Sequence, residues 1–168
     1  QAGKNTKQRK KRDPEQEYND ATHFFPDGPT ECGFPTAGFK ACGCRGAKNI
    51  VGLDMTVART SFHMNGELVP IYGKREMDDR IVRIGGKGTG TPTPRYRPIF
   101  KEWATIFNVR FNADTISYAQ LVNSFEVGGF GCGVGELRPE KSPVGSMGMF
   151  HVGTEEEFAY YADKYGKK

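Results

Sequence analysis

The sequence contains no long hydrophobic run. Its 168 residues include no stretch approaching the ~20 apolar residues of a membrane-spanning helix, so we expect no transmembrane segment and no membrane partner. It has only four cysteines, too few for a disulfide scaffold at this length, which indicates a reducing intracellular environment. Those at positions 32, 42 and 44 lack the short paired spacing of zinc sites. Small buried side chains are therefore a simpler interpretation than metal ligands.

Groupings that carry catalysis are also missing. No Ser-His-Asp or Cys-His set stands in a supporting context, and Glu136 and Glu140 around Arg138 are more simply ion-pair partners. The glycine-rich run 128–135 lacks the Lys-Ser/Thr pair of a P-loop. It also follows a predicted helix instead of opening one, unlike a dinucleotide-binding motif. We therefore expect a protein that is not an enzyme and uses neither a cofactor nor a metal.

Acidic residues are absent from the first twelve positions, which carry six basic ones. The whole chain has 24 Lys and Arg against 20 Asp and Glu, so the rest of it is close to neutral. A basic arm neutralises phosphates and releases counterions, although it can equally be a solvated tail that maintains solubility. We assign residues 1–12 to this arm and residues 13–168 to a single domain, in which residues 73–98 form a basic loop insertion rich in glycine and proline.

The remaining pattern is organised around a strand, a helix and a glycine-rich run. Alternating apolar side chains over 103–111 predict a half-buried strand. Ser117 and Gln120 have the spacing of a capping box for a helix whose apolar face spans 118–125 and which the glycines at 128–129 are expected to end. The glycine-rich run then either lets a phosphate approach the backbone or only forms turns.

Local capping and turn signals predict the other elements. An acidic or hydroxyl side chain directly before a helix accepts hydrogen bonds from its first amides, and Asn-Gly favours a tight hairpin turn. The elements predicted in this way are a helix after Asp13, a helix over 33–48 with Thr36 as N-cap, a short helix after Asp54, a hairpin around Asn65-Gly66, a strand over 80–84 and a C-terminal helix after Thr154.

Two segments carry a family resemblance. The run Gly128-Gly-Phe-Gly-Cys-Gly-Val-Gly135 follows a helix, and Phe34-Pro-Thr-Ala-Gly-Phe-Lys40 combines a hydrophobic residue, a proline and a lysine at fixed spacing. They are similar to motifs of the RAMP proteins, in particular of their Cas7-like branch, where a hydrophobic-Pro-x-Ser-x-Leu-Lys-Gly segment opens a helix. The overall layout, with the segment 135–141 near the end, also resembles uncharacterised phage proteins of the same type. The similar regions cover residues 33–48 and 103–152.

This resemblance implies a fold and a function. RAMP proteins of this branch are modified ferredoxin-like, or RRM-like, RNA-binding proteins of CRISPR effector complexes. We therefore expect an α+β fold, with a ferredoxin-like antiparallel sheet, helices on one face, the basic insertion and a C-terminal helix. We also expect single-stranded DNA or RNA as partner, in a homo-oligomer or a larger nucleoprotein assembly, and a cytoplasmic location in a bacterial host if the chain is phage-encoded.

The sequence departs from the family at two places. Cys42 and Gly43 stand where the family has glycine and an aliphatic residue. In addition, no apolar strand precedes the basic arm, although a family member opens with one. The second departure leads to the hypothesis that the chain is a fragment whose first strand lies outside it.

We expect nucleic acid to contact basic and glycine-rich positions. Lys40, Arg45 and Lys48 share one side of a predicted helix, although a cationic face can simply be solvated. Residues 95–97 place a tyrosine that can stack on a base between two arginines, and the alternative is a loop without a ligand. The predicted contact residues are Lys40, Arg45, Lys48, Arg80, Arg83, Lys87, Arg95, Tyr96, Arg97, Gly131, Gly133, Gly135, Arg138 and Lys141.

Two functions of different classes remain open. The first is non-catalytic binding of single-stranded nucleic acid through the basic loops and the glycine-rich run, including as a multimer or filament. The second is a structural or interaction protein, such as an inhibitor that mimics a CRISPR effector subunit, or a scaffold subunit of another assembly. A salt-dependent shift of a labelled oligonucleotide favours the first, and tight binding to a protein without oligonucleotide affinity favours the second.

Overall fold

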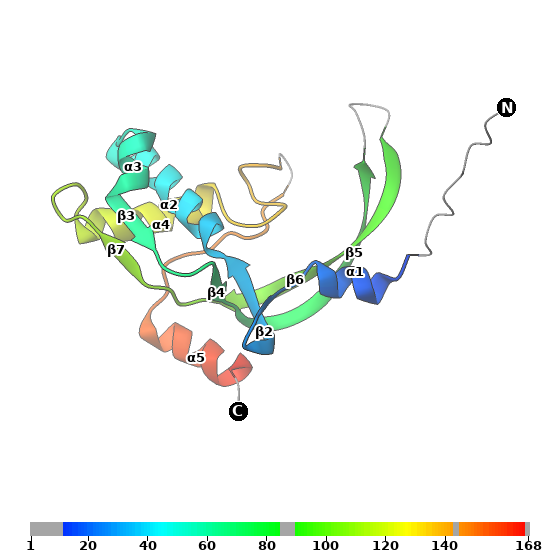
Figure 1. Ribbon diagram of the computed structural model, residues 1–168. Coiled ribbons are helices and arrows are strands. Elements are labelled where there is room, and N and C mark those ends of the chain that lie inside the picture. Colours follow the sequence, from blue (N-terminus) through cyan, green and yellow to red (C-terminus); the bar gives the residue numbers. More distant parts are fainter. Residues whose placement is uncertain (1–11, 85–89, 143–144, 167–168) are drawn as a thin grey trace. The chain divides into compact units, whose positions relative to one another are not determined.

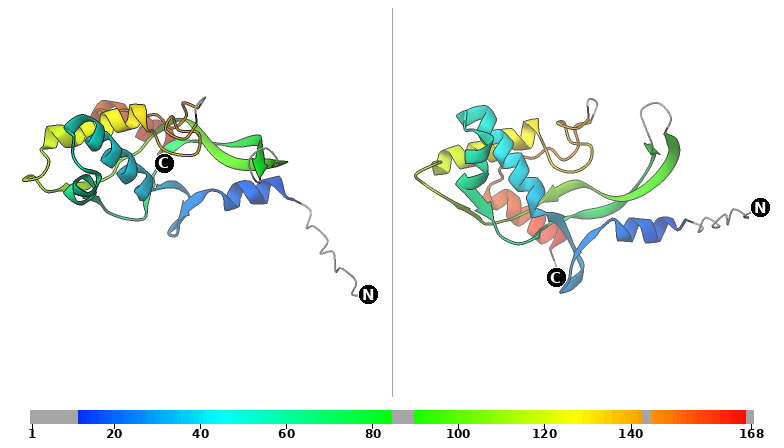
Figure 2. Two further views of the ribbon diagram at one scale, coloured as in Figure 1. Left: turned by 90° about the horizontal axis from the view of Figure 1, so that it is seen from above. Right: turned by 45° about the horizontal axis from the view of Figure 1, so that its top comes forward.

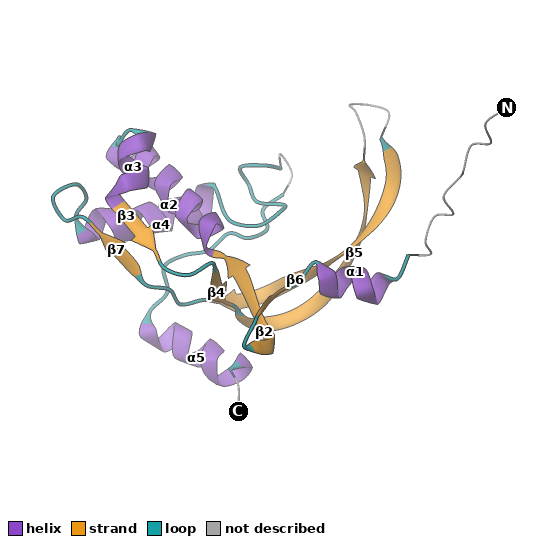
Figure 3. Cartoon of the chain, viewed as in Figure 1, coloured by secondary structure: helices purple, strands orange, loops and turns teal. Residues whose placement is uncertain are grey.

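The computed structural model describes residues 12–84, 90–142 and 145–166. Its helices and small antiparallel sheets confirm the predicted α+β class (Figure 1 and Figure 3). No helix in these ranges combines the length and the apolar composition that crossing a bilayer requires. The helices are α1 (Pro14–Asp20), α2 (Thr36–Val51), α3 (Met55–Ser61), α4 (Tyr118–Gly131) and α5 (Glu155–Tyr165). The strands are β1 (His23–Phe25), β2 (Gly28–Pro35), β3 (Phe62–Met64), β4 (Leu68–Pro70), β5 (Tyr72–Ile84), β6 (Thr91–Ala104) and β7 (Val109–Phe111).

The chain divides into two compact units. Unit 1 contains Gln1–Thr22 and Arg75–Lys101, and unit 2 contains His23–Lys74 and Glu102–Lys168. In this division the N-terminal helix is grouped with a segment from the middle of the chain. Such grouping depends on long-range contacts, which local sequence signals do not carry.

Unit 1 consists of α1 and most of the β5–β6 hairpin. Asp13 caps α1 as predicted, since its carboxylate accepts hydrogen bonds from the amides of Glu15 and Gln16. The guanidinium of Arg75 in β5 lies 4.3 Å from the centre of the Tyr18 ring, within cation–π range. It also donates a hydrogen bond to the Thr22 hydroxyl at 3.0 Å. These contacts attach the helix to the first strand of the hairpin.

Unit 2 contains two small antiparallel sheets in its described residues. One has the strand order β1-β2-β4, and the other pairs β3 with β7. The predicted hairpin around Asn65-Gly66 is wrong, because β3 and β4 take different partners. Phe34 of β2 lies opposite Val69 of β4, while His63 of β3 lies opposite Arg110 of β7. A ferredoxin-like sheet is not confirmed by this pairing.

The helices α2 and α4 pack against each other at glycine contacts, and Figure 2 shows them side by side in both views. A Cβ atom added at Gly46 would overlap the carbonyl oxygen of Ser124. One added at Gly128 would lie only 2.6 Å from the carbonyl oxygen of Cys42. The expected helix end at 128–129 is therefore wrong. Those glycines lie inside α4, which continues to Gly131, and they allow the close approach of the two backbones.

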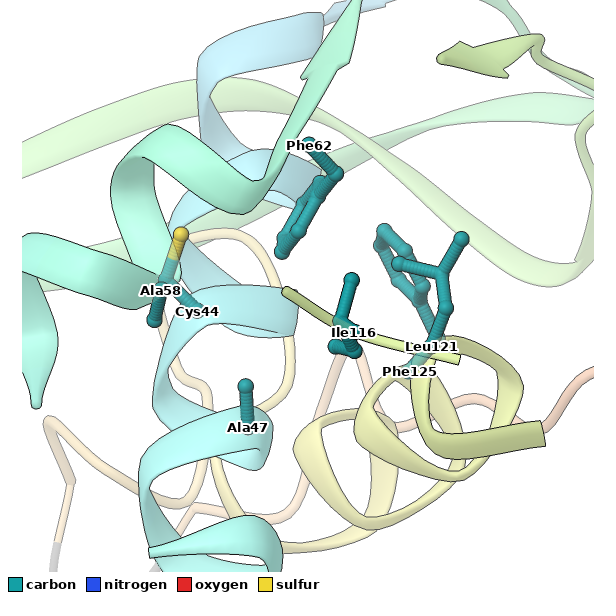
Figure 4. Packing of buried hydrophobic residues seen from close by; sticks show 7 residues of the cluster. All are labelled: Cys44, Ala47, Ala58, Phe62, Ile116, Leu121 and Phe125. Atoms are coloured by element: carbon teal, nitrogen blue, oxygen red, sulfur yellow. The ribbon is translucent and has the colours of Figure 1, made fainter. Parts of the chain in front are cut away.

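The main hydrophobic core of unit 2 lies between these helices, α3 and the start of β3. Phe62 and Phe125 meet edge-to-face with their ring centres 5.6 Å apart. Figure 4 shows the side chains of the cluster converging from their separate segments. The cluster consists of Cys44, Ala47, Ala58, Phe62, Ile116, Leu121 and Phe125.

The predicted strand over 103–111 is interrupted. It is divided between the end of β6 and β7, and Thr105–Asn108 are not in a strand. Phe107 lies in the interruption and packs into the core, with its ring centre 5.2 Å from that of Phe39 and 5.6 Å from that of Phe125. This inward turn accounts for the break in the strand.

Two helix starts illustrate how local the capping signals are. Ser117 forms the predicted capping box with Gln120 at the start of α4. In contrast, α2 begins at Thr36 itself, because residues 33–35 complete β2 and Pro35 is the N-cap without a side-chain hydrogen bond. The predicted start at residue 33 and the predicted Thr36 cap are therefore wrong.

The C-terminal helix α5 packs on the base of the β5–β6 hairpin within unit 2. Thr154 caps it, with Glu157 completing the predicted capping box. The ring of Phe158 meets that of Tyr72 edge-to-face at 5.1 Å. Lys164 and Tyr165 both donate to the carboxylate of Glu102, at 3.0 and 3.3 Å. The helix is therefore attached through one aromatic contact and one polar cluster.

Candidate functional site

The predicted contact residues fall into both units. Lys87 lies outside the described residues. Unit 1 holds Arg80, Arg83, Arg95, Tyr96 and Arg97. Unit 2 holds Lys40, Arg45, Lys48, Gly131, Gly133, Gly135, Arg138 and Lys141. The structure thus gives two groups of candidate positions, each with its own geometry.

The unit 1 group lies on strands, where the sequence predicted a loop. Residues 72–84 and 91–104 pair as β5 and β6, which includes the strand predicted over 80–84 (Figure 1). Pro92 and Pro94 lie within β6. Proline is tolerated in a strand where no hydrogen-bonding partner is needed, and every strand of a two-stranded sheet has one free edge. The glycine and proline content therefore did not prevent strand formation.

Charge is unevenly distributed along the hairpin. In the part of the hairpin that belongs to unit 1, the acidic residues Glu76, Asp78 and Asp79 all precede residue 80, whereas the segment 80–97 contains five basic residues and no acidic one. Two of these acids are neutralised locally, because Glu76 pairs with Lys101 at 2.6 Å and Asp78 pairs with Arg80. Beyond that pair, the charged residues of the segment 81–101 are all basic. Arg83 is exposed there, while Tyr96 is half-buried.

The glycine-rich run of unit 2 is partly packed and partly open. Gly133 and Gly135 have φ values of +64° and +86°, which residues with a side chain rarely adopt. The need for a turn therefore explains these two glycines. The amide of Val134 donates to the carbonyl of Gly148 at 2.8 Å and fixes the run against a later segment. A Cβ atom at Gly131 or Gly135 would meet nothing within 4 Å. Of the five glycines in the run, these two have open space beside the backbone.

Arg45 and Arg138 share one carboxylate. The Nε atom of Arg45 lies 2.5 Å from Glu140 Oε1, and that of Arg138 lies 3.3 Å from Oε2. Arg138 also donates to the carbonyl of Gly135 at 2.8 Å. The interpretation of Glu140 as an ion-pair partner is confirmed. Arg45 thus joins α2 to the loop after α4, whereas Arg138 connects residues within that loop. The two arginines and Glu140 together retain one net positive charge.

Two buried thiols lie beneath this loop. Cys42 of α2 and Cys132 after α4 belong to one buried cluster. Burial raises the pKa of Cys42 from 9.0 to about 12, and burial likewise raises the pKa of Cys132. Among the described residues, no cluster of His, Cys, Asp and Glu is suited to hold a metal ion. Both thiols pack in this cluster with Phe39, Val69 and Val134.

We expect Cys42 to resist alkylation in the folded protein. A thiol reacts as its thiolate, and the raised pKa lowers the thiolate fraction at pH 8 by about a thousandfold. Mass spectrometry of iodoacetamide-treated protein should show Cys42 modified at least ~100-fold more slowly in buffer than in urea. Equal rates in the two conditions would contradict the burial seen here.

Unit 2 also contains a hollow lined in part by basic side chains, which the sequence did not predict. The hollow has a volume of about 410 Å³, and its lining residues are Thr60, Ser61, His63, Arg110, Phe111 and Asn112. The predicted residue Lys40 reaches the same place, since its Nζ atom lies 3.2 Å from His63 Nδ1. Strand alternation assigns His63 and Arg110 to outward faces, but local patterns cannot show that β3 and β7 pair.

Comparison of the chain with protein families, with curated proteins and with solved structures found no match.

Proposed function

We propose that this protein binds single-stranded nucleic acid without catalysing a reaction on it. The observation that carries the proposal is the outer part of the β5–β6 hairpin, where basic residues follow one another over 80–97 with no acid among them. Such a stretch offers favourable contacts to successive phosphates. Tyr96, between Arg95 and Arg97, provides an aromatic ring of the kind on which bases stack.

The resemblance to RAMP proteins supports the same proposal. The segment Phe34–Lys40 runs from the end of β2 into the start of α2, in keeping with a motif that opens a helix. The second half of the glycine-rich run, residues 132–135, follows α4, as the glycine-rich loop of those proteins follows a helix, whereas the first half forms the end of α4 itself. We therefore include a RAMP-like, ferredoxin-like origin of the fold and a cytoplasmic location in the proposal.

The test is the salt dependence of oligonucleotide binding. Fluorescence anisotropy of labelled single-stranded DNA and RNA would be measured over a range of KCl concentrations. For single strands, each phosphate contact contributes about −0.7 to the slope of log affinity against log salt. The double variant R83Q/R97Q is expected to flatten that slope by about 1.4 and to weaken binding at low salt.

A matched control removes the same charge elsewhere. The double variant R59Q/K101Q also replaces two basic residues, one on α3 and one in the acid-bearing part of the hairpin. It should retain the wild-type slope. Binding of neither DNA nor RNA by the wild type, or equal losses in the two double variants, would refute the proposal.

A second candidate, an interaction or scaffold protein, is favoured by one observation on α4. Its side chains Tyr118 and Phe130, near the two ends of the helix, are 71% and 72% exposed, so α4 presents aromatic surface to a protein partner. Size-exclusion chromatography with and without oligonucleotide separates the two functions. Assembly that needs no nucleic acid and persists in high salt would favour the second.

A further inference from the structure

The basic hollow of unit 2 is built on the pairing of β3 with β7. His63 lies directly opposite Arg110 in that pair, and both side chains are exposed. Their neighbours Phe62 and Val109 belong to the hydrophobic core on the other face. Two basic groups directly across a sheet are unfavourable when both are charged. Their position thus needs an explanation beyond strand pairing.

A third basic group converges on the same place from α2. The Nζ atom of Lys40 lies 3.2 Å from Nδ1 of His63. Because a lysine ammonium group only donates, Nδ1 accepts this hydrogen bond, and the neutral imidazole carries its proton on Nε2. That Nε2–H remains available as a donor.

The hollow next to these groups contains donors and no carboxylate. The residues that line it include no Asp or Glu. Arg110 donates to the side-chain oxygen of Asn65 at 2.9 Å, and neither Arg110 nor Lys40 forms an ion pair with an acid within the described ranges. Asn112 uses its side-chain oxygen to accept from the amide of Asp114, so its NH2 group is left to donate.

We propose that this hollow is a binding site for a phosphate group. No carboxylate lines the hollow, and phosphate supplies the negative charge that the basic side chains would otherwise find in an acidic partner. Its several oxygens can accept hydrogen bonds from more than one of these side chains at once. Arginine binds such a group through its planar fork, and lysine binds it as a point charge. The phosphate binds between Arg110 and the Lys40–His63 pair. This proposal does not depend on the hairpin, so it can hold or fail separately from the proposed function.

The test uses inorganic phosphate as the probe. It would be titrated into the full chain in chloride buffer at constant ionic strength, and the NMR signals of the His63 ring and the Arg110 Nε–H would be followed. The wild type is expected to give saturable shifts of both signals. The variant R110Q should weaken phosphate binding about tenfold, since a hydrogen bond to a charged group contributes roughly one such factor.

The control variant is R59Q, which removes the same charge from an exposed arginine of α3 that does not line the hollow. It should bind phosphate as the wild type does. Thermal melting of R110Q and R59Q checks that both remain folded, as expected for exposed side chains. Shifts that do not saturate, or equal weakening in R110Q and R59Q, would overturn the site.

The source of the phosphate is separated by a competition arm. A single-stranded oligonucleotide without terminal phosphates would be added to the phosphate-bound protein. If the oligonucleotide displaces phosphate at His63 and Arg110, the site takes a phosphodiester of a strand. If these signals stay in the phosphate-bound position, it takes free phosphate or a phosphate monoester. The proposal is refuted if neither ligand changes the two signals.

Discussion

Replacing Phe39 by alanine is expected to lower the free energy of unfolding by about 3–5 kcal/mol, the range for phenylalanine truncated in a core. Phe39 is 1% exposed and its ring meets several others. The ring centres lie 5.6 Å from that of Phe34, 6.1 Å from Trp103, 5.2 Å from Phe107 and 5.5 Å from Phe150. Because these rings come from three separate parts of the chain, their collapse into the space left by Phe39 is restricted.

Urea denaturation measures this effect. Trp103 is the single tryptophan of the chain and lies next to Phe39, so its fluorescence reports on the affected region. The control is F130A, the same substitution at a side chain that is 72% exposed. It should change the free energy of unfolding by no more than ~0.5 kcal/mol. Similar losses in the two variants would mean that Phe39 does not occupy a packed core.

Replacing Gly46 by alanine is expected to destabilise the protein by about 1–3 kcal/mol, through overpacking between α2 and α4. Alanine is intrinsically the better helix residue, by up to ~1 kcal/mol, so the sign of the result separates packing from propensity. The added methyl group would overlap the Ser124 carbonyl, which is backbone and cannot rotate away. The two helices would have to separate.

The matched control is G131A, at the last residue of α4. No atom lies within 4 Å of a Cβ placed there, so this variant should be neutral or slightly stabilising. Both variants would be compared with the wild type by urea denaturation. A stabilising effect of G46A would show that the helices do not approach as closely as described here.

Features set by neighbouring residues could be predicted from the sequence. The caps Asp13, Ser117 and Thr154 each bond to amides two or three residues further along, and all three are confirmed. The α+β class follows from such elements. A cap fails as a predictor where a strand runs directly into a helix, as at Thr36, because the pairing of β2 determines where the helix begins.

Features set by distant residues could not be predicted. The role of Gly46 and Gly128 depends on which helix passes beside them, and a glycine pattern alone does not distinguish a helix contact from a loop. Strand partners raise the same difficulty. Nothing near His63 indicates that Arg110, far along the chain, becomes its neighbour. The predicted contact set therefore included Lys40 but missed His63, to which Lys40 is hydrogen-bonded, and Arg110, which lies opposite His63.

The prolines of β6 have a consequence for self-association. Pro92, Pro94 and Pro98 stand at even separations, so their missing amide hydrogens fall on one side of the strand. Since the ladder with β5 needs donors, that side is the outer one. An unprotected outer side invites another extended chain to add itself and start aggregation. An extended chain added to this side of β6 would find no amide donor at three positions. The β5–β6 hairpin is therefore expected to contact its partners through side chains and not through backbone pairing.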